Sequence, residues 1–115
     1  LFDEPSAHLD ANARMEAAKA IRRTMESNEK AAMVIDHDTY FLDIVSDSIL
    51  VFQGEGGKNG LAVGPLSLRK GMNLFLSDAD VTFRRAVESH RPRINKPSSR
   101  KDREQKSSGE YFYSD

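Results

Sequence analysis

The chain contains no cysteine among its 115 residues. It therefore has no disulfide bond, no thiol nucleophile and no cysteine-based metal site, and a reducing intracellular compartment fits this composition. The sequence also lacks an apolar run of membrane-spanning length, and its first residues lack the charged-then-apolar pattern of a signal peptide. We therefore expect a soluble protein with a cytoplasmic location and no membrane partner.

Two glycine-rich phosphate-binding motifs are absent as well. The sequence has no Gly-x-x-x-x-Gly-Lys-Ser/Thr loop and no Leu-Ser-Gly-Gly motif. The glycine-rich stretch 54–60 does contain Lys58, but Asn59 follows it where a phosphate loop has Ser or Thr. This stretch is rich in residues that tolerate a positive φ, so it predicts the turn of a hairpin rather than a phosphate loop.

The charge is unevenly distributed along the chain. Residues 1–83 carry 8 Lys and Arg against 13 Asp and Glu, whereas residues 84–106 carry 9 against 3, within a net charge of -1. Residues 91–109 are also rich in Pro and Ser and almost free of apolar side chains, so we expect an extended basic arm there. The aromatic run Tyr111–Tyr113 would pin this arm back onto the body.

The order of predicted elements indicates an α/β fold. Asp10 is a good N-cap for a helix over residues 11–27, which is rich in strong helix formers. The apolar run 31–35 predicts a strand covered on both faces, as parallel strands are. We further expect a helix over 39–46, a hairpin of strands 48–53 and 61–63, a helix that begins at Pro65 and Ser67 and ends near Leu76, and a short strand over 81–85.

Asp3, Glu4 and Pro5 are the first candidates for chemistry. Two adjacent acids at the carboxyl end of an apolar strand suit nucleotide hydrolysis, because one carboxylate holds Mg²⁺ through water while its neighbour polarises the attacking water. Neighbouring side chains of a strand point to opposite faces, which lets the two acids take different roles. Alone, the tripeptide fits a turn with an acidic N-cap near Pro5 as well as it fits a catalytic site.

Three further features make the motif more specific. Leu1-Phe2 precedes the two acids and Ser6-Ala7-His8-Leu9-Asp10 follows them. His37, within Ile35-Asp36-His37-Asp38, stands 33 residues beyond Glu4, after one helix and one strand. This β-α-β order is a parallel crossover. Together the features resemble the Walker B strand, D-loop and switch histidine of ABC-type ATPases, which implies the C-terminal half of a P-loop NTPase domain.

The resemblance implies a role for each of these residues. Asp3 would be the acid that holds Mg²⁺ through water, and Glu4 would be the catalytic carboxylate. His37 would contact the γ-phosphate of ATP, because a histidine can donate to a phosphate oxygen and link that contact to the attacking water. Ser6 and Asp10 would belong to the D-loop, which crosses between two ATPase domains, and Asp10 would also cap the following helix.

The second half of the chain narrows the resemblance. It is similar to the end of the ribosome-recycling ABC-type ATPases, also called the RNase L inhibitor family, in the blocks Gly71–Leu76, Thr82–Arg85, Arg91–Lys96 and Lys101–Phe112. This resemblance implies that residues 1–80 are the C-terminal part of the second ATPase domain of such a protein. Residues 81–115 would then be a basic hinge and tail segment.

In that family, two ATPase domains joined by hinges follow an iron–sulfur domain, and their closure on ATP splits the ribosome. The resemblance implies ATP and Mg²⁺ as cofactors, with iron–sulfur clusters only in an upstream part. It implies as partners the other ATPase domain of the same protein, the small ribosomal subunit with its RNA, and release or rescue factors. Because the chain begins with Leu1 and lacks a phosphate loop, we expect the upstream part to be missing and this piece alone not to hydrolyse ATP.

Two interpretations of the basic segment stay open. Its residues would touch ribosomal RNA phosphates or, as we favour, pair with acids of the ATPase domains in a hinge stiffened by Pro92 and Pro97. These basic residues are Arg84, Arg85, Arg91, Arg93, Lys96, Arg100 and Lys101. Two alternatives for the whole chain also stay open: the nucleotide-binding subunit of an ABC membrane transporter, and a non-enzymatic fragment that binds RNA or the ribosome.

Overall fold

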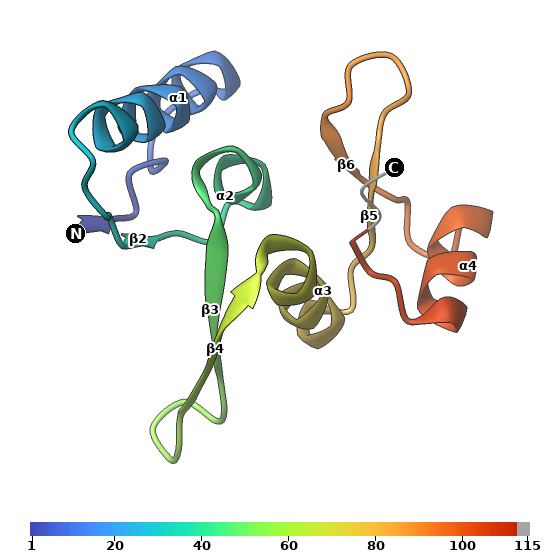
Figure 1. Ribbon diagram of the computed structural model, residues 1–115. Helices are drawn as coiled ribbons and strands as arrows, with labels where there is room; N and C mark the ends of the chain where they lie inside the picture. Colours follow the sequence, from blue (N-terminus) through green and yellow to red (C-terminus); the bar gives the residue numbers. More distant parts are fainter. Residues whose placement is uncertain (113–115) are drawn as a thin grey trace. The chain divides into compact units, whose positions relative to one another are not determined.

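The computed structural model describes residues 1–112. The chain forms two compact units, Leu1–Ser46 and a second unit that begins at Asp47, and each combines short strands with helices (Figure 1). The α/β class predicted from the sequence is therefore confirmed. Within the described residues, no helix has the length and apolar character needed to cross a membrane. The predicted functional boundary between residues 80 and 81 differs from this division and stays a prediction.

The first unit is built on one pair of parallel strands. Strand β1 (Phe2–Asp3) pairs with β2 (Val34–Ile35), and helix α1 (Ala11–Ser27) connects them. Helix α2 (Thr39–Val45) follows β2. Ala18 of α1 and Phe41 of α2 have no exposed surface, so the core of this unit lies where the two helices pack. Helix α1 has the predicted range, and α2 ends one residue before the predicted end.

The prediction for the strand over residues 31–35 was partly wrong. Only Val34 and Ile35 pair, and the side chains of Met33 and Ile35 are 56% and 50% exposed. A strand is covered on both faces only when other elements pack on each of them. Within the described residues, β2 has β1 as its single partner strand, so its apolar side chains are not enclosed.

The second unit begins with the predicted hairpin. Strand β3 (Ser48–Gln53) pairs antiparallel with β4 (Leu61–Ser67), which is longer than expected. Helix α3 (Leu68–Ala79) packs on this hairpin, and its residues Met72 and Leu76 are buried. The packing is close, because α3 has a glycine, Gly71, where its backbone meets Ile49 of the hairpin.

The start and end of α3 differ slightly from the prediction. Pro65 lies in strand β4, whereas Ser67 is the N-cap and accepts a hydrogen bond from the N–H of Lys70 at 3.3 Å. The helix continues past Leu76 and ends before Asp80, whose φ of 56° places it in the left-handed region that closes helices. The predicted start at Pro65 and Ser67 was too early, since the helix begins at Leu68, and the predicted end was three residues too early.

The extended arm predicted for residues 91–109 was wrong. Strands β5 (Phe83–Arg85) and β6 (Pro92–Ile94) form an antiparallel pair, and helix α4 (Arg100–Ser108) follows them. Buried polar side chains, rather than apolar ones, hold these elements together. Asn95 donates to the Thr82 hydroxyl at 2.9 Å and to the Gln105 amide oxygen at 2.6 Å.

The aromatic run at the end of the sequence docks as predicted in its described part. Phe112 is 2% exposed and forms a β-bridge with Phe83. The N–H of Tyr111 donates to the side-chain oxygen of Asn73 in α3 at 2.6 Å. Tyr113 lies outside the described residues.

Candidate functional site

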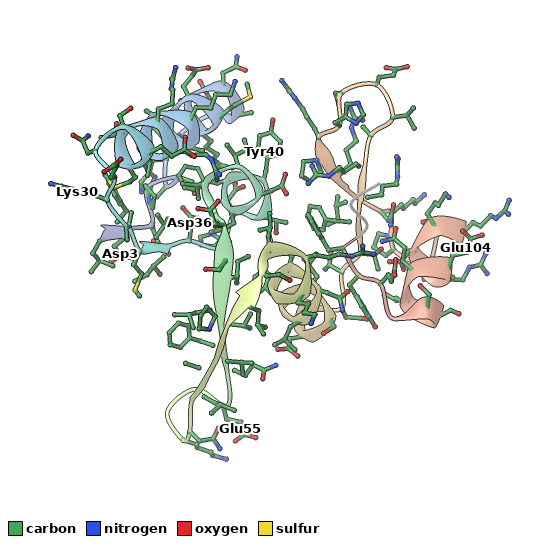
Figure 2. The ribbon with its side chains drawn as sticks, viewed as in Figure 1. Asp3, Lys30, Asp36, Tyr40, Glu55 and Glu104 are labelled. Carbon is green, nitrogen blue, oxygen red and sulfur yellow. The ribbon has the colours of Figure 1, made fainter. Side chains whose placement is uncertain are left out.

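The loops that carry the predicted catalytic residues leave two parallel strands at the same end. Asp3 lies opposite Ile35 in the strand register, and the N–H of Glu4 donates to the carbonyl of Ile35 at 2.7 Å. Figure 2 shows Asp3 on β1 and Asp36 directly after β2. The carboxyl ends of parallel strands are where α/β proteins place their ligands, so the sequence motif and the strand order indicate the same place.

Asp3 is the residue predicted to hold Mg²⁺. Its side chain is exposed and makes no hydrogen bond or ion pair with the described residues. Among residues 1–112, no group of three or more His, Asp or Glu side chains is placed to hold a metal ion. Mg²⁺ keeps several of its waters and takes one or two carboxylates together with substrate phosphates. Asp3 therefore fits Mg²⁺ as a single protein ligand, acting through water beside the phosphates of a nucleotide.

Glu4 and His37 meet across the two loops. Nδ1 of His37 lies 3.6 Å from Oε1 of Glu4, and the two side chains are 78% and 55% exposed. This distance is too long for a strong hydrogen bond, and an exposed pair of this kind adds little stability. Both groups are thus close to each other and open to a ligand.

The backbone at Glu4 is in an uncommon conformation. Its φ of 47° lies in the left-handed region, which costs a residue with a side chain about 1–2 kcal/mol. Its N–H is held by the carbonyl of Ile35, and its own carbonyl accepts from the N–H of Ala7 at 3.0 Å. Such strain collects at functional sites, where the surrounding contacts maintain it.

Asp36 joins the two loops. Its Oδ1 accepts the hydroxyl hydrogen of Ser6 at 2.8 Å, and its Oδ2 accepts the N–H of Ser6 at 3.1 Å. Oδ1 also accepts the N–H groups of His37 at 2.8 Å and Asp38 at 3.0 Å. Ser6, a predicted D-loop residue, is 4% exposed, and both its N–H and its hydroxyl donate to this carboxylate.

The pKa of Asp36 lies below its usual range. Partial burial raises this pKa, but the hydrogen bond from the backbone of Asp38, together with those from Ser6 and His37, outweighs the effect of burial. Asp36 is therefore ionised at neutral pH, and each of its hydrogen bonds is made to a charged acceptor.

Asp38 anchors the other side of the His37 loop. Its Oδ1 caps helix α2 by accepting the N–H of Phe41 at 2.9 Å, and its Oδ2 pairs with Arg14 of α1 at 2.7 Å. Neither Asp36 nor Asp38 was assigned a role from the sequence. The position of Asp38 directly before a predicted helix is the signal that would have identified its capping function.

Asp10 takes the structural part of its predicted role. Its carboxylate caps α1 by accepting the N–H of Ala13 at 2.8 Å. The structure thus brings Glu4, His37 and Ser6 together around Asp36, whereas the carboxylate of Asp10 is used at the start of α1. A role for Asp10 in contacting a second ATPase domain stays a prediction.

The predicted basic residues lie in the second unit, on β5, β6 and the segments beside them. Arg84 and Arg93 are directly opposite each other in the register of β5 and β6. Like charges in this position destabilise a strand pair unless solvent or an anion separates them. Arg93 is exposed and Arg84 is half-buried. The pair therefore concentrates positive charge on one face of the ribbon.

The other residues of the basic segment differ in their contacts. Arg85 lies over the ring of Phe112, 5.7 Å from its centroid, and donates to the carbonyl of His90 at 2.9 Å. Arg91 and Lys96 are exposed. The structure gives Arg85 contacts within the second unit.

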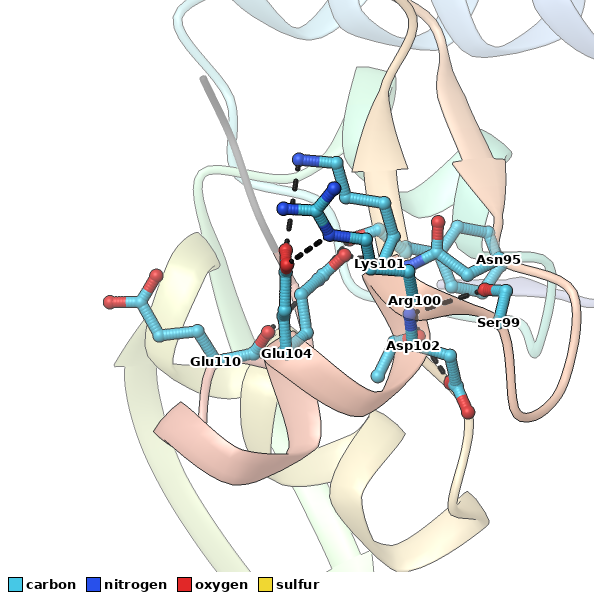
Figure 3. Close-up of polar contacts among 10 residues, drawn as sticks. Asn95, Ser99, Arg100, Lys101, Asp102, Glu104 and Glu110 are labelled. Carbon is cyan, nitrogen blue, oxygen red and sulfur yellow. Dashed lines mark hydrogen bonds and ion pairs between the residues drawn. The ribbon is translucent and has the colours of Figure 1, made fainter.

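A cavity of about 350 Å³ lies beside β5 and α4. Arg84, Arg85 and Lys101 line it together with Glu104. Glu104 pairs with Arg100 at 2.8 Å and with Lys101 at 3.9 Å, as Figure 3 shows. Arg100 and Lys101 are thus paired within their own helix, whereas the hinge interpretation pairs basic residues with acids of the ATPase domains.

Comparisons with known proteins identify relatives over the whole chain. An uncharacterized ABC transporter ATP-binding protein of Methanocaldococcus jannaschii is 47% identical, and the translation initiation factor RLI1 of Saccharomyces cerevisiae is 48% identical. Each alignment covers 100% of this chain and 19% of the relative. The chain therefore spans about a fifth of the length of the curated relatives that it matches. No model of a protein family matches it.

Solved structures give the same result. An archaeal ribosome recycling factor, aABCE1, in complex with the archaeal ribosomal stalk protein aP1, matches 97% of this chain with a TM-score of 0.91 and 53% identity. A structure of an RNase-L Inhibitor matches 98% with a TM-score of 0.91 and 52% identity. A model of ribosome-bound archaeal Pelota and ABCE1 matches 96% with a TM-score of 0.90. The matches cover 22%, 22% and 19% of those chains, respectively.

Proposed function

Because the chain belongs to the ribosome-recycling ABC-type ATPases, the RNase L inhibitor family, we propose that it supplies the hydrolytic half of an ATP site in a protein that splits ribosomes. The observation that carries this proposal is the 3.6 Å approach of Glu4 and His37 from two loops at the carboxyl ends of parallel strands. An acid and a histidine that are exposed and adjacent can act on the same bound phosphate and water.

Each residue is assigned a role in this site. Asp3 would hold Mg²⁺ through water, and the ion would supply positive charge beside the phosphate oxygens of ATP. Glu4 accepts a hydrogen bond from the attacking water and so polarises it. Nδ1 of His37 faces Glu4, which leaves Nε2 to donate to an oxygen of the γ-phosphate. The phosphate loop and the Leu-Ser-Gly-Gly motif are absent from this sequence, so other segments must supply both, and the chain alone is inactive.

The Glu4→Gln variant tests the assignment in the protein that contains this chain. Loss of a general base lowers a rate by about 10²–10⁴-fold, so we expect ATP to bind and remain trapped while its turnover falls by about that factor. Glu16→Gln is the matched control, because Glu16 is an exposed residue of α1 and loses the same charge. Unchanged ATP turnover in Glu4→Gln would show that Glu4 is not the catalytic carboxylate.

The relatives support ribosome splitting as the process that this ATPase drives. One is named as a ribosome recycling factor and was solved with a ribosomal stalk protein, and another is placed on the ribosome beside Pelota. We propose the same classes of partner here: the small ribosomal subunit and its RNA, release or rescue factors, and the other ATPase domain. The protein then acts in the cytoplasm without a membrane partner, and any iron–sulfur clusters lie in segments other than this cysteine-free one.

The transporter alternative shares the acids and the switch histidine but not the second unit. The relatives at 47% and 48% identity match through the basic segment to the end of the chain. One of them is named as an ABC transporter ATP-binding protein, although it is uncharacterized. Stimulation of ATP turnover by ribosomes, with none by membrane vesicles, would favour ribosome splitting, and the reverse result would favour the transporter.

A further inference from the structure

One carboxylate connects the loop that carries Glu4 with the loop that carries His37. Asp36 accepts four hydrogen bonds, two from Ser6 and one each from the backbone N–H groups of His37 and Asp38, at 2.8 to 3.1 Å. Two of the donors belong to the first loop and two to the second. Both oxygens of Asp36 are used, since Oδ2 takes the N–H of Ser6 and Oδ1 takes the other three.

The contact between Asp36 and Ser6 fixes the position of Glu4. Ser6 is 4% exposed, so its hydroxyl has no ready alternative partner in water. It is separated from Glu4 by Pro5 alone, and the carbonyl of Glu4 accepts the N–H of Ala7 in a tight turn around it. A shift of Ser6 therefore moves the strained backbone of Glu4, whose φ is 47°.

The other side of Asp36 transmits position to His37. The N–H of His37 is itself one of the donors, so the histidine backbone is fixed to the same carboxylate as Ser6. Beyond it, Asp38 is tied to α1 through Arg14 and to α2 through Phe41. The imidazole is thus carried by a short loop that is anchored on both sides, while its ring remains 78% exposed.

We infer that Asp36 is a positioning residue for ATP hydrolysis, which holds the water-polarising Glu4 and the phosphate-binding His37 in register by clamping Ser6 to the His37 loop. This inference rests on the proposed function of Glu4 and His37. Asp36 itself touches neither nucleotide nor water in this role. It sets the distance between two groups that must meet the same phosphate, and misplacement of catalytic groups by small distances is costly to the rate.

The Asp36→Asn variant breaks the clamp with little change in size. An amide oxygen in the place of Oδ1 can still accept the Ser6 hydroxyl and the N–H groups of His37 and Asp38, but an amide nitrogen in the place of Oδ2 cannot accept the N–H of Ser6. In the protein that contains this chain, we expect kcat for ATP to fall about tenfold, which corresponds to about 1.4 kcal/mol, while KM for ATP stays within about twofold. Asp36→Glu keeps the charge and both acceptors and is expected to recover most of the rate.

Ser6→Ala and the double variant test the connection itself. If Ser6 and Asp36 act through one contact, Ser6→Ala lowers kcat by about threefold. The kcat of the double variant Ser6→Ala/Asp36→Asn then lies within about twofold of that of Asp36→Asn alone. In the absence of nucleotide, we also expect faster hydrogen–deuterium exchange at the amide of Ser6 in Asp36→Asn, since this amide loses its acceptor, whereas the amide of Asp38 keeps its own. Glu16→Gln controls for the lost charge.

A purely structural role gives a different pattern. If Asp36→Asn lowers the unfolding temperature and the affinity for ATP together with kcat, and Asp36→Glu does not restore the rate, the inference is wrong. An unchanged kcat in Asp36→Asn would also overturn the inference. So would a double variant whose loss of kcat is the product of the losses in Asp36→Asn and Ser6→Ala. The Glu4→Gln variant is measured in parallel. If Glu4→Gln stops ATP turnover, a failure of the Asp36 variants contradicts only the role of Asp36. If Glu4→Gln does not stop turnover, the proposed function and the inference fail together.

Discussion

Thr82 donates its hydroxyl hydrogen to Oδ1 of Asp102 at 2.6 Å, and this bond links the start of the β5–β6 ribbon to helix α4. Thr82 has no exposed surface and Asp102 is 4% exposed. The same hydroxyl accepts from Asn95, and Gln105 continues the contacts by donating to the carbonyl of Phe83 at 2.8 Å. Polar side chains therefore form the interior of a segment whose composition contains few apolar residues.

Thr82→Val is expected to loosen α4. Valine has nearly the same shape but leaves a buried donor of Asn95 and the carboxylate of Asp102 without the hydroxyl, and an unsatisfied buried group costs about 1–3 kcal/mol. We expect hydrogen–deuterium exchange at the amides of α4 to become about tenfold to a hundredfold faster. Ser107→Ala, on the exposed side of the same helix, is the control and should leave the exchange unchanged. Equal exchange in both variants would show that the polar interior does not hold α4.

The stability of α4 is expected to depend on pH through Asp102. The Thr82 hydroxyl, the N–H of Ser98 and Lys106 hold the pKa of Asp102 below its usual value. An Asp whose pKa is lower in the folded state than in the unfolded chain, where it is about 3.9, stabilises the fold. The whole of this stabilisation is present above the unfolded-state pKa, and it is lost as the pH falls through the folded-state pKa. We therefore compare hydrogen–deuterium exchange at the α4 amides of wild type and Asp102→Asn at the same pH. The difference between the two proteins should be constant from neutral pH to about pH 5 and should become smaller below about pH 4. A difference that does not change with pH would contradict this assignment.

The elements around the catalytic motif could be predicted because their signals are local. Asp10 is an N-cap whose side chain accepts a hydrogen bond from the third residue of the following helix, as the sequence indicated. The outcome for residues 91–109 was different, because the prediction assumed that a folded segment needs apolar residues. Ser99 before Asp102 and Gly109 after Ser108 are helix start and stop signals that would have located α4.

The site was predictable as a set of residues but not as a geometry. Sequence spacing placed Glu4 and His37 at the ends of neighbouring strands, and the 3.6 Å approach agrees with that placement. The clamp by Asp36 was not predictable, because its partner Ser6 lies 30 residues away in the sequence and the pairing depends on the strand register. The sequence around a polar residue does not indicate which distant hydrogen-bond donor that residue will contact.

Gly71→Ala is expected to destabilise the packing of α3 on the β3–β4 hairpin. A Cβ atom at residue 71 would lie 2.6 Å from Cβ of Ile49, so one of the two elements must move. The gain in helix propensity is about 1 kcal/mol, whereas overpacking costs about 1–3 kcal/mol, so the net effect is a loss of stability. Gly56→Ala is the matched control, since a Cβ there meets nothing within 4 Å. A lower unfolding temperature in both variants, or in neither, would contradict the close approach.

Arg93→Glu tests whether the basic ribbon acts in ribosome splitting. In this variant the residue opposite Arg84 changes from a like charge to an opposite one, so the β5–β6 pair should be no less stable than before. Reduced ATP-dependent splitting of ribosomes could then not be attributed to unfolding of the ribbon. We expect such a reduction, measured by separation of the subunits in a density gradient, with Arg103→Glu on the exposed surface of α4 as the control for the change of charge.

The salt dependence of binding separates the two roles proposed for Arg93. If it contacts RNA phosphates, Arg93→Glu weakens binding to the small ribosomal subunit and reduces the slope of log affinity against log salt by about 1. If it acts in the hinge, as we favour, binding and its salt slope stay unchanged while ATP-dependent splitting falls. Unchanged splitting by Arg93→Glu would exclude both roles for this residue.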